Sequence, residues 1–196
     1  NHTSWSDIIV LSATGQVSFI AKSEVKSWPV FGFFAVLQRT VFVERERRGK
    51  TGEQTSDIAK RLADGDAMVL FPEGTTSDDN RVLPFKTALF GAAHAAIREA
   101  GVPEVIVQPV AIAYTGVHGM AMGRYHRPIA SWPGDVQLMP HLKGILREGA
   151  IDVEVRFGEP VVVTAETDRK ALARTMENRV RALLQSSLLG REVLED

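Results

Sequence analysis

The stretch VIVQPVAIAY, residues 105–114, is rich in apolar and β-branched side chains and predicts a buried β-strand. The proline inside it favours a sheet edge or a bulge, because proline has no N–H group to donate to a neighbouring strand. Runs of the same character occur along the rest of the chain, and we predict strands at VSFIA (17–21), TVFVE (40–44), AMVLF (67–71) and IDVEVRFG (151–158).

Helix-like segments separate these strands. Apolar residues recur at helical spacing in residues 51–63, residues 85–100 are rich in alanine, and residues 168–189 carry an apolar stripe opposite arginines. The alternation predicts an α/β fold, in which residues 1–196 form a single domain with a mixed, largely parallel sheet flanked by helices. Residues 116–134 show no clear period and predict a long functional or mobile loop.

The composition excludes several kinds of protein. The 196 residues carry a net charge of -1, which gives no global reason to bind nucleic acid. The absence of cysteine excludes disulfides and zinc sites built from thiolates. No apolar run approaches the roughly 20 residues that cross a bilayer. Because the chain starts without methionine or a leader, we expect a longer natural protein, whose missing segment could include a membrane anchor.

A polar cluster, NHTSWSD, occupies residues 1–7. Neutral imidazole takes a proton from a hydroxyl near neutral pH, and a nearby carboxylate stabilises the imidazolium that forms. His2 and Asp7 are such a pair if the loop before a helix folds Asp7 back under His2. The alternative interpretation is a surface histidine close to an aspartate that caps a helix.

A second cluster, LFPEGTTSD (residues 70–78), follows a predicted strand. Open α/β folds bind ligands at the carboxyl ends of their strands, so we expect Glu73 to face a ligand there. The backbone N–H groups from Glu73 to Thr75, including that of Gly74, are candidates for holding an anionic oxygen. The alternative is a turn in which proline and glycine have only a conformational role.

A third cluster, TVFVERERRGK (residues 40–50), places Arg45 at the end of a strand. The guanidinium fork matches the oxygens of a phosphate, so this cluster suits an anionic ligand. The alternative is a solvated loop in which Glu44 and Glu46 already pair with the arginines.

Four blocks in this order resemble the glycerolipid acyltransferase family, which is PlsC-like and includes the 1-acylglycerol-3-phosphate and lysophospholipid acyltransferases. The matching residues are Asn1, His2 and Asp7 in the first block, Arg45 after "VFV" in the second, "FPEGTTS" in the third, and Pro109 with Val110 in the fourth. The resemblance extends from residue 1 to about residue 112. Two positions depart from it, because Arg39 replaces a glycine that often opens the second block and Thr76 replaces the arginine of the third.

The resemblance implies that a fatty acyl group moves from a thioester, on coenzyme A or acyl carrier protein, to the hydroxyl of a lysolipid. In this mechanism His2 is the general base, Asp7 orients its ring, and Arg45 with Lys86 binds the anionic group of the acceptor. Glu73, Gly74, Thr75 and Thr76 belong to the substrate-binding loop, and no metal or nucleotide cofactor is implied.

The first choice of acceptor is 1-acylglycerol-3-phosphate, in phospholipid biosynthesis. The threonine at position 76 keeps a second choice open, a lyso-ornithine lipid or another aminolipid, unless Arg81 supplies the missing cation. A hydrolase and a non-catalytic lipid-binding protein remain further alternatives. The family also implies work at a membrane surface, on the cytoplasmic face of the bacterial inner membrane, and WPVFGFF (residues 28–34) is either an interfacial segment or an ordinary core helix.

Overall fold

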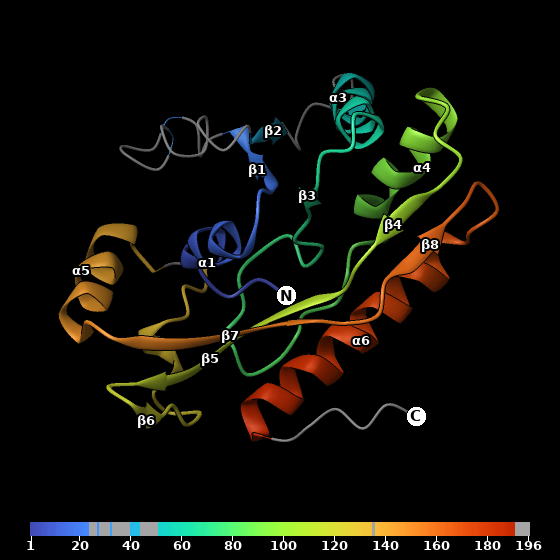
Figure 1. The fold of residues 1–196 in the computed structure, drawn as a ribbon. Coiled ribbons are helices and arrows are strands. Elements are labelled where there is room, and N and C mark those ends of the chain that lie inside the picture. The colour runs from blue at the N-terminus through green and yellow to red at the C-terminus, as the bar shows by residue number, and fades with distance from the viewer. Residues whose placement is uncertain (24–26, 28–31, 33–39, 44–50, 135, 191–196) are drawn as a thin grey trace.

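The structure is a computed structural model that describes residues 1–196 except 24–26, 28–31, 33–39, 44–50, 135 and 191–196 (Figure 1). Its elements in chain order are α1 (Ser6–Thr14), β1 (Ser18–Lys22), β2 (Val41–Val43), α3 (Thr51–Ala63), β3 (Met68–Val69), η2 (Thr87–Phe90), α4 (Gly91–Glu99), β4 (Val105–Val107), β5 (Val110–Val117), β6 (Met120–Ala121), η3 (Arg127–Ile129), α5 (Leu138–Glu148), β7 (Ile151–Phe157), β8 (Val161–Val163) and α6 (Arg169–Leu189).

The strands form three small sheets in the described part of the chain. The order β2-β1-β3 is parallel, whereas β4 with β8 and the order β6-β5-β7 are antiparallel. The predicted mixed α/β class is therefore confirmed. The expectation of a largely parallel arrangement holds only for β1 to β3, because β7 and β8 run antiparallel to β5 and β4, and β6 forms a hairpin with β5.

The run at residues 105–114 is two strands and not one. β4 pairs with β8, and β5 pairs with β7, so the chain changes sheets at Gln108 and Pro109. The Pro109 carbonyl accepts the Gly158 N–H at 2.8 Å, which joins the two strand junctions. The proline thus ends one ladder before the next begins, as its missing N–H requires.

Most of the other predicted elements are present. Helices occur at residues 51–63 and 169–189 as expected, while the segment at 85–100 divides into η2 and α4. The strand predicted at 67–71 is shorter, at Met68–Val69. The predicted loop at 116–134 contains the β5–β6 hairpin and η3. α5, β6 and β8 were not predicted.

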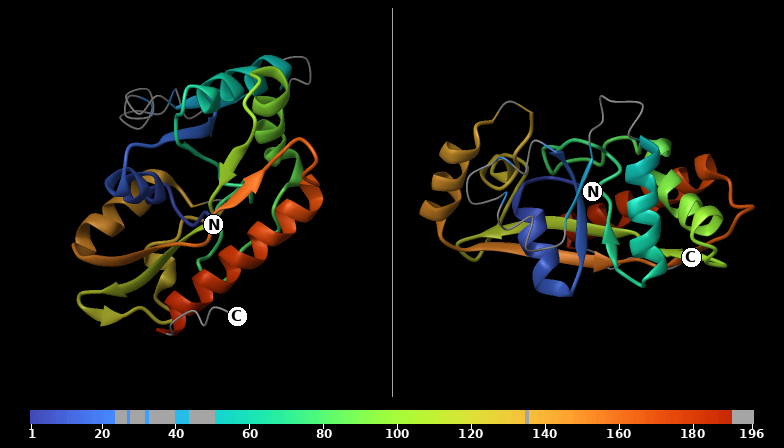
Figure 2. Two further views of the ribbon diagram at one scale, coloured as in Figure 1. Left: turned by 45° about the vertical axis from the view of Figure 1, so that its right-hand side comes forward. Right: turned by 90° about the horizontal axis from the view of Figure 1, so that it is seen from above.

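β5 separates two apolar cores. Its side chains alternate, so that Ala111 and Ala113 pack in the cluster around α6, whereas Ile112 and Tyr114 pack with Leu11 of α1. α6 and α1 accordingly lie on opposite sides of the β5–β7 pair (Figures 1 and 2). This arrangement brings the start of the chain against the middle of β5.

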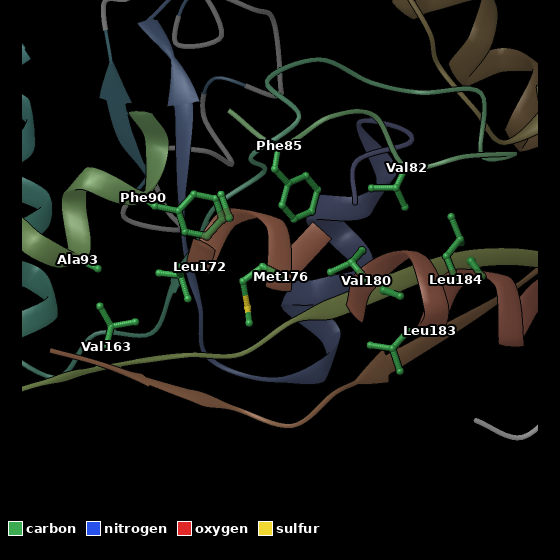
Figure 3. Close-up of a cluster of buried hydrophobic side chains, with 13 residues drawn as sticks. Val82, Phe85, Phe90, Ala93, Val163, Leu172, Met176, Val180, Leu183 and Leu184 are labelled. Atoms are coloured by element: carbon green, nitrogen blue, oxygen red, sulfur yellow. The ribbon is translucent and has the colours of Figure 1, made fainter. Parts of the chain in front are cut away.

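The larger core is built on α6 (Figure 3). Asp168 caps the helix by accepting the N–H groups of Lys170 and Ala171, and Gly190 ends it in the left-handed conformation. The buried stripe comprises Leu172, Ala173, Met176, Val180, Leu183 and Leu184, which meet Val82, Phe85 and Phe90. Burying each large apolar side chain contributes roughly 1.5 to 3 kcal/mol, so α6 fixes the chain segment that follows β3.

Candidate active site

His2 and Asp7 form a hydrogen-bonded pair at the start of α1. The Nδ1 atom of His2 lies 2.8 Å from Oδ2 of Asp7, whose side chain is fully buried, while 19% of the His2 side chain is exposed. The same oxygen accepts the backbone N–H groups of Thr3 at 2.7 Å and Ser4 at 3.1 Å. Asp7 thus binds the turn before α1 as well as the imidazole, but it does not cap α1, whose N-cap residue is Trp5.

This geometry determines which imidazole nitrogen is available. A carboxylate only accepts hydrogen bonds, so Nδ1 of His2 carries the proton and Nε2 keeps its lone pair. The ring stacks on Phe71, two residues after the end of β3, with ring centroids 4.0 Å apart and an angle of 21° between the planes. The imidazole is thus fixed on one face by an aromatic ring and at one edge by Asp7.

The second oxygen of Asp7 is held by Tyr114 of β5. The Tyr114 hydroxyl lies 2.8 Å from Asp7 Oδ1 and 2.6 Å from Ser6 Oγ, and the residue is 2% exposed. Burial, reinforced by the Asp7 carboxylate, raises the pKa of Tyr114 well above its usual range. Tyr114 therefore remains protonated and donates to Asp7, while Ser6 donates to Tyr114.

Glu73 connects the loop after β3 to the His2 segment. Its Oε1 accepts the His2 backbone N–H at 2.7 Å, and its Oε2 accepts the Leu83 N–H at 2.7 Å. The side chain is 1% exposed, and this burial raises the pKa of Glu73, although the two N–H donors act in the opposite direction. The Glu73 side chain therefore points inward, and both of its carboxylate oxygens bind backbone N–H groups inside the molecule.

Further backbone contacts close the loop around the pair. Ser77 donates its N–H to the His2 carbonyl at 2.8 Å, and Trp132 donates its N–H to the Thr3 carbonyl at 2.9 Å. The Thr76 hydroxyl donates to the Trp132 carbonyl at 2.5 Å. Three segments far apart in the sequence are thereby tied together around His2.

Side chains also form hydrogen bonds with backbone groups of β5, on the edge opposite β7. Asn1 Oδ1 accepts the Ile112 N–H and Asn1 Nδ2 donates to the Ile112 carbonyl, both at 2.8 Å. Asp79 Oδ2 accepts the Tyr114 N–H at 3.2 Å, and Asp79 Oδ1 accepts the Thr3 hydroxyl at 3.1 Å. Burial raises the pKa of Asp79 to about 7. Thr3 and Tyr114 each bridge Asp7 and Asp79.

Residues 1–113 match a family model described as Acyltransferase, which covers more than half of the chain. The chain belongs to the acyltransferase family. It is similar to two proteins called lyso-ornithine lipid O-acyltransferase. The one from Brucella abortus (strain 2308) is 87% identical over 195 residues, which are 100% of this chain and 73% of the relative. The one from Rhizobium meliloti (strain 1021) is 58% identical over 191 residues, 97% of this chain and 65% of the relative.

The chain is also similar to proteins named for a phosphate-bearing acceptor. The 1-acyl-sn-glycerol-3-phosphate acyltransferase of Neisseria gonorrhoeae is 35% identical over 184 residues, 94% of this chain and 67% of the relative. The crystal structure of the 1-acyl-sn-glycerophosphate acyltransferase PlsC from Thermotoga maritima matches with a TM-score of 0.63 and 25% identity, over 100% of this chain and 66% of that one. The present chain therefore spans about two thirds to three quarters of these relatives.

The other residues proposed for the acyltransferase site are placed as follows. Gly74 has φ of 72°, and a Cβ there would lie 2.6 Å from Lys86 Nζ, so the lysine side chain crosses directly over the glycine. The Gly74 N–H donates to the Phe71 carbonyl at 3.1 Å, which removes it from the candidates for binding an anion. Thr75 is exposed beside it. Arg45 lies outside the described residues.

No group of three or more His, Asp or Glu that could bind a metal occurs in the described part of this acyltransferase. The helices that the structure describes include none that is both long enough and apolar enough to span a membrane. Tyr114, Asp79 and Trp132 were not predicted from the sequence to belong to this site. Tyr114 alone carried a signal, because it lies on the same face of the predicted strand as Ile112 and ends an otherwise aliphatic run.

Proposed function

We propose that this acyltransferase moves a fatty acyl group from an acyl thioester to the hydroxyl of a lyso-ornithine lipid. The observation that carries the reaction type is the His2–Asp7 pair, with Nδ1 held by a buried carboxylate and Nε2 left to accept a proton. The 87% identity to a protein named lyso-ornithine lipid O-acyltransferase supports the choice of acceptor. Lyso-ornithine lipid, the second choice from the sequence, is therefore preferred as acceptor to 1-acylglycerol-3-phosphate, the first choice.

In the proposed reaction His2 Nε2 removes the proton of the lysolipid hydroxyl as its oxygen attacks the thioester carbonyl. A carbon–oxygen bond forms and the carbon–sulfur bond breaks. The imidazolium, stabilised by Asp7, then returns the proton to the thiolate that leaves. No covalent acyl-enzyme is needed, and the acyl thioester of coenzyme A or acyl carrier protein is a co-substrate, with no bound cofactor.

The threonine at position 76 also suits an aminolipid. Thr76 adds no charge beside the loop, and its hydroxyl binds the Trp132 carbonyl. An ornithine head group carries an ammonium, which an arginine at this position would repel. Lys86, across Gly74, remains as a cation for an anionic group of either substrate.

A second candidate acceptor is 1-acylglycerol-3-phosphate. Relatives from Neisseria gonorrhoeae and Thermotoga maritima are named for this type of substrate. Arg45, proposed from the sequence, would bind its phosphate. For either acceptor the substrate carries a long acyl tail, so we propose that the protein works at a membrane surface, on the cytoplasmic face of the bacterial inner membrane.

The test is a product assay with defined lysolipids. The protein is incubated with a labelled acyl thioester, as acyl-CoA or acyl-ACP, and with lyso-ornithine lipid or 1-acylglycerol-3-phosphate, and products are identified by mass spectrometry. We expect the esterified ornithine lipid and a fall of about two to four powers of ten for His2→Ala. Free fatty acid as the only product would instead identify a hydrolase. No turnover with any lysolipid, from a folded protein in the presence of vesicles, would favour a non-catalytic lipid-binding protein.

A further inference from the structure

The Tyr114 hydroxyl is the donor to the side of Asp7 that faces away from His2. Asp7 Oδ2 receives the His2 ring and the N–H groups of Thr3 and Ser4, whereas Oδ1 receives Tyr114 at 2.8 Å. Tyr114 is 2% exposed and Asp7 is fully buried, so water cannot readily reach Asp7 Oδ1. Loss of the Tyr114 donor would therefore leave a buried acceptor without a partner, which costs free energy.

Tyr114 is also held firmly at its backbone. It lies in β5 in register with Val153 of β7, and its N–H donates to Asp79. A side chain on a paired central segment of a strand has little freedom to move, so its hydroxyl fixes the rotation of the carboxyl group. When Oδ1 is fixed, Oδ2 must point toward the His2 ring.

We propose that Tyr114 is a positioning residue for acyl transfer. Its hydroxyl orients Asp7 and limits how strongly Asp7 stabilises the His2 imidazolium. The inference rests on the proposed function, in which His2 takes up and returns a proton. A hydrogen bond to Oδ1 disperses the negative charge of the carboxylate. Without it the imidazolium is stabilised more strongly, and a larger fraction of His2 is protonated at a given pH.

Other charged groups surround the pair and stay in place when the Tyr114 hydroxyl is removed. Glu73 binds the His2 backbone, Asp79 lies behind Thr3 and Tyr114, and Arg127 lies close enough to Asp79 to favour its charged form. Lys86 crosses Gly74 on the same loop as Glu73. A change seen only on removal of the hydroxyl therefore reports the bond to Asp7.

The experiment compares Tyr114→Phe with Ser6→Ala in the full chain. Phenylalanine keeps the ring and removes the donor to Asp7, whereas Ser6→Ala removes a partner of the same hydroxyl and leaves that donor. For Tyr114→Phe we expect kcat to fall about tenfold, with KM for acyl thioester and lysolipid unchanged within about twofold. The acidic limb of the kcat/KM profile should move to higher pH by about half a unit to one unit. Ser6→Ala keeps the donor to Asp7, so its profile should shift by clearly less than that of Tyr114→Phe.

A lower kcat with an unchanged pH profile, or an equal shift in Ser6→Ala, would overturn the proposal, because loss of packing alone produces no selective shift. If Tyr114→Phe does not fold, a fluorinated tyrosine at position 114 replaces it. Fluorine makes the hydroxyl a stronger donor, so the acidic limb should then move to lower pH, and an unmoved limb would again refute the inference.

A second measurement separates this inference from the proposed function. The NMR signals of the His2 ring, assigned with His2→Ala, are followed against pH in wild type and Tyr114→Phe without substrate. A higher midpoint in the variant supports the inference even if no lysolipid is acylated. An identical midpoint contradicts it even if the wild-type protein is an active acyltransferase.

Discussion

His2 and Glu73 are 71 positions apart in the sequence and are joined by a hydrogen bond of 2.7 Å from the His2 backbone N–H to Glu73 Oε1. The other oxygen of Glu73 accepts the Leu83 N–H. A single buried carboxylate thus connects the start of the chain to both ends of the loop that follows β3. Its contacts make Glu73 a structural support of the His2 segment.

We predict that Glu73→Gln destabilises the protein by about 1 to 3 kcal/mol, because an amide offers one acceptor oxygen where two backbone N–H groups need one each. The loss of His2 alignment should also lower kcat by about ten- to a hundredfold. Urea denaturation and steady-state kinetics measure the two effects, and Glu159→Gln, at an exposed position, is the matched control. Normal stability with a raised KM for lysolipid alone would show that Glu73 contacts substrate.

We predict that Thr76→Arg shifts acceptor preference toward phosphate. The new cation should repel the ammonium of an ornithine head group and favour 1-acylglycerol-3-phosphate, so the ratio of the two kcat/KM values should change by about tenfold or more. Thr76→Val, which only removes the bond to the Trp132 carbonyl, is the control. Equal effects of Thr76→Arg on both acceptors would show that this position does not distinguish the head groups.

We predict that the stability of the protein depends on pH because of Asp79. Burial in the folded protein raises the pKa of Asp79 from its ordinary value of 3.8 to about 7, so the folded state binds more protons than the unfolded state between these values. The free energy of unfolding should therefore fall as pH rises from about 4 to 7, by at most about 1.4 kcal/mol per unit for this group. Asp79→Asn should remove that contribution to the slope.

Urea denaturation of wild type and Asp79→Asn at several pH values measures the difference in slope. Asp79→Asn should also change the absolute stability, because asparagine cannot accept hydrogen bonds from both Thr3 and Tyr114. The slope against pH, and not the absolute value, therefore tests the titration of Asp79. Parallel stability curves for the two proteins would mean that Asp79 does not titrate in this range.

We predict that Leu184→Ala in α6 destabilises the protein by about 2 to 5 kcal/mol, since this residue is 2% exposed and lies in the larger core (Figure 3). Leu146→Ala removes a side chain that is 70% exposed and should change stability by less than about 0.5 kcal/mol. A difference below about 1 kcal/mol between the two variants, measured in urea, would contradict the packing of α6 against the segment after β3.

The sequence predicts those parts of the site whose residues lie close together along the chain. His2 and Asp7 are five positions apart, so a helix start and its preceding turn are enough to bring them together. Tyr114 and Asp79 join the same network through strand register and a loop, which no local pattern specifies. The direction of Glu73 also depended on where the distant Leu83 N–H lay.

Helix α5 was missed for a different reason. Its residues 138–148 include Pro140 and Gly144, which lower helix propensity, although proline is tolerated in the first turn of a helix. β8, with three residues, is too short to give a clear periodic signal, and it forms because β4 offers it an antiparallel partner.

The hydrogen bonds of Asn1 and Asp79 to β5 have a consequence for the edge of this strand. An open strand edge is a template on which another polypeptide can add, and here two side chains occupy the N–H groups of Ile112 and Tyr114 in place of a neighbouring strand. Substitutions at Asn1 or Asp79 would leave these buried N–H groups without an acceptor, at a cost of about 1 to 3 kcal/mol each. The residues packed around His2 and Asp7 therefore also take the place of a strand beside β5.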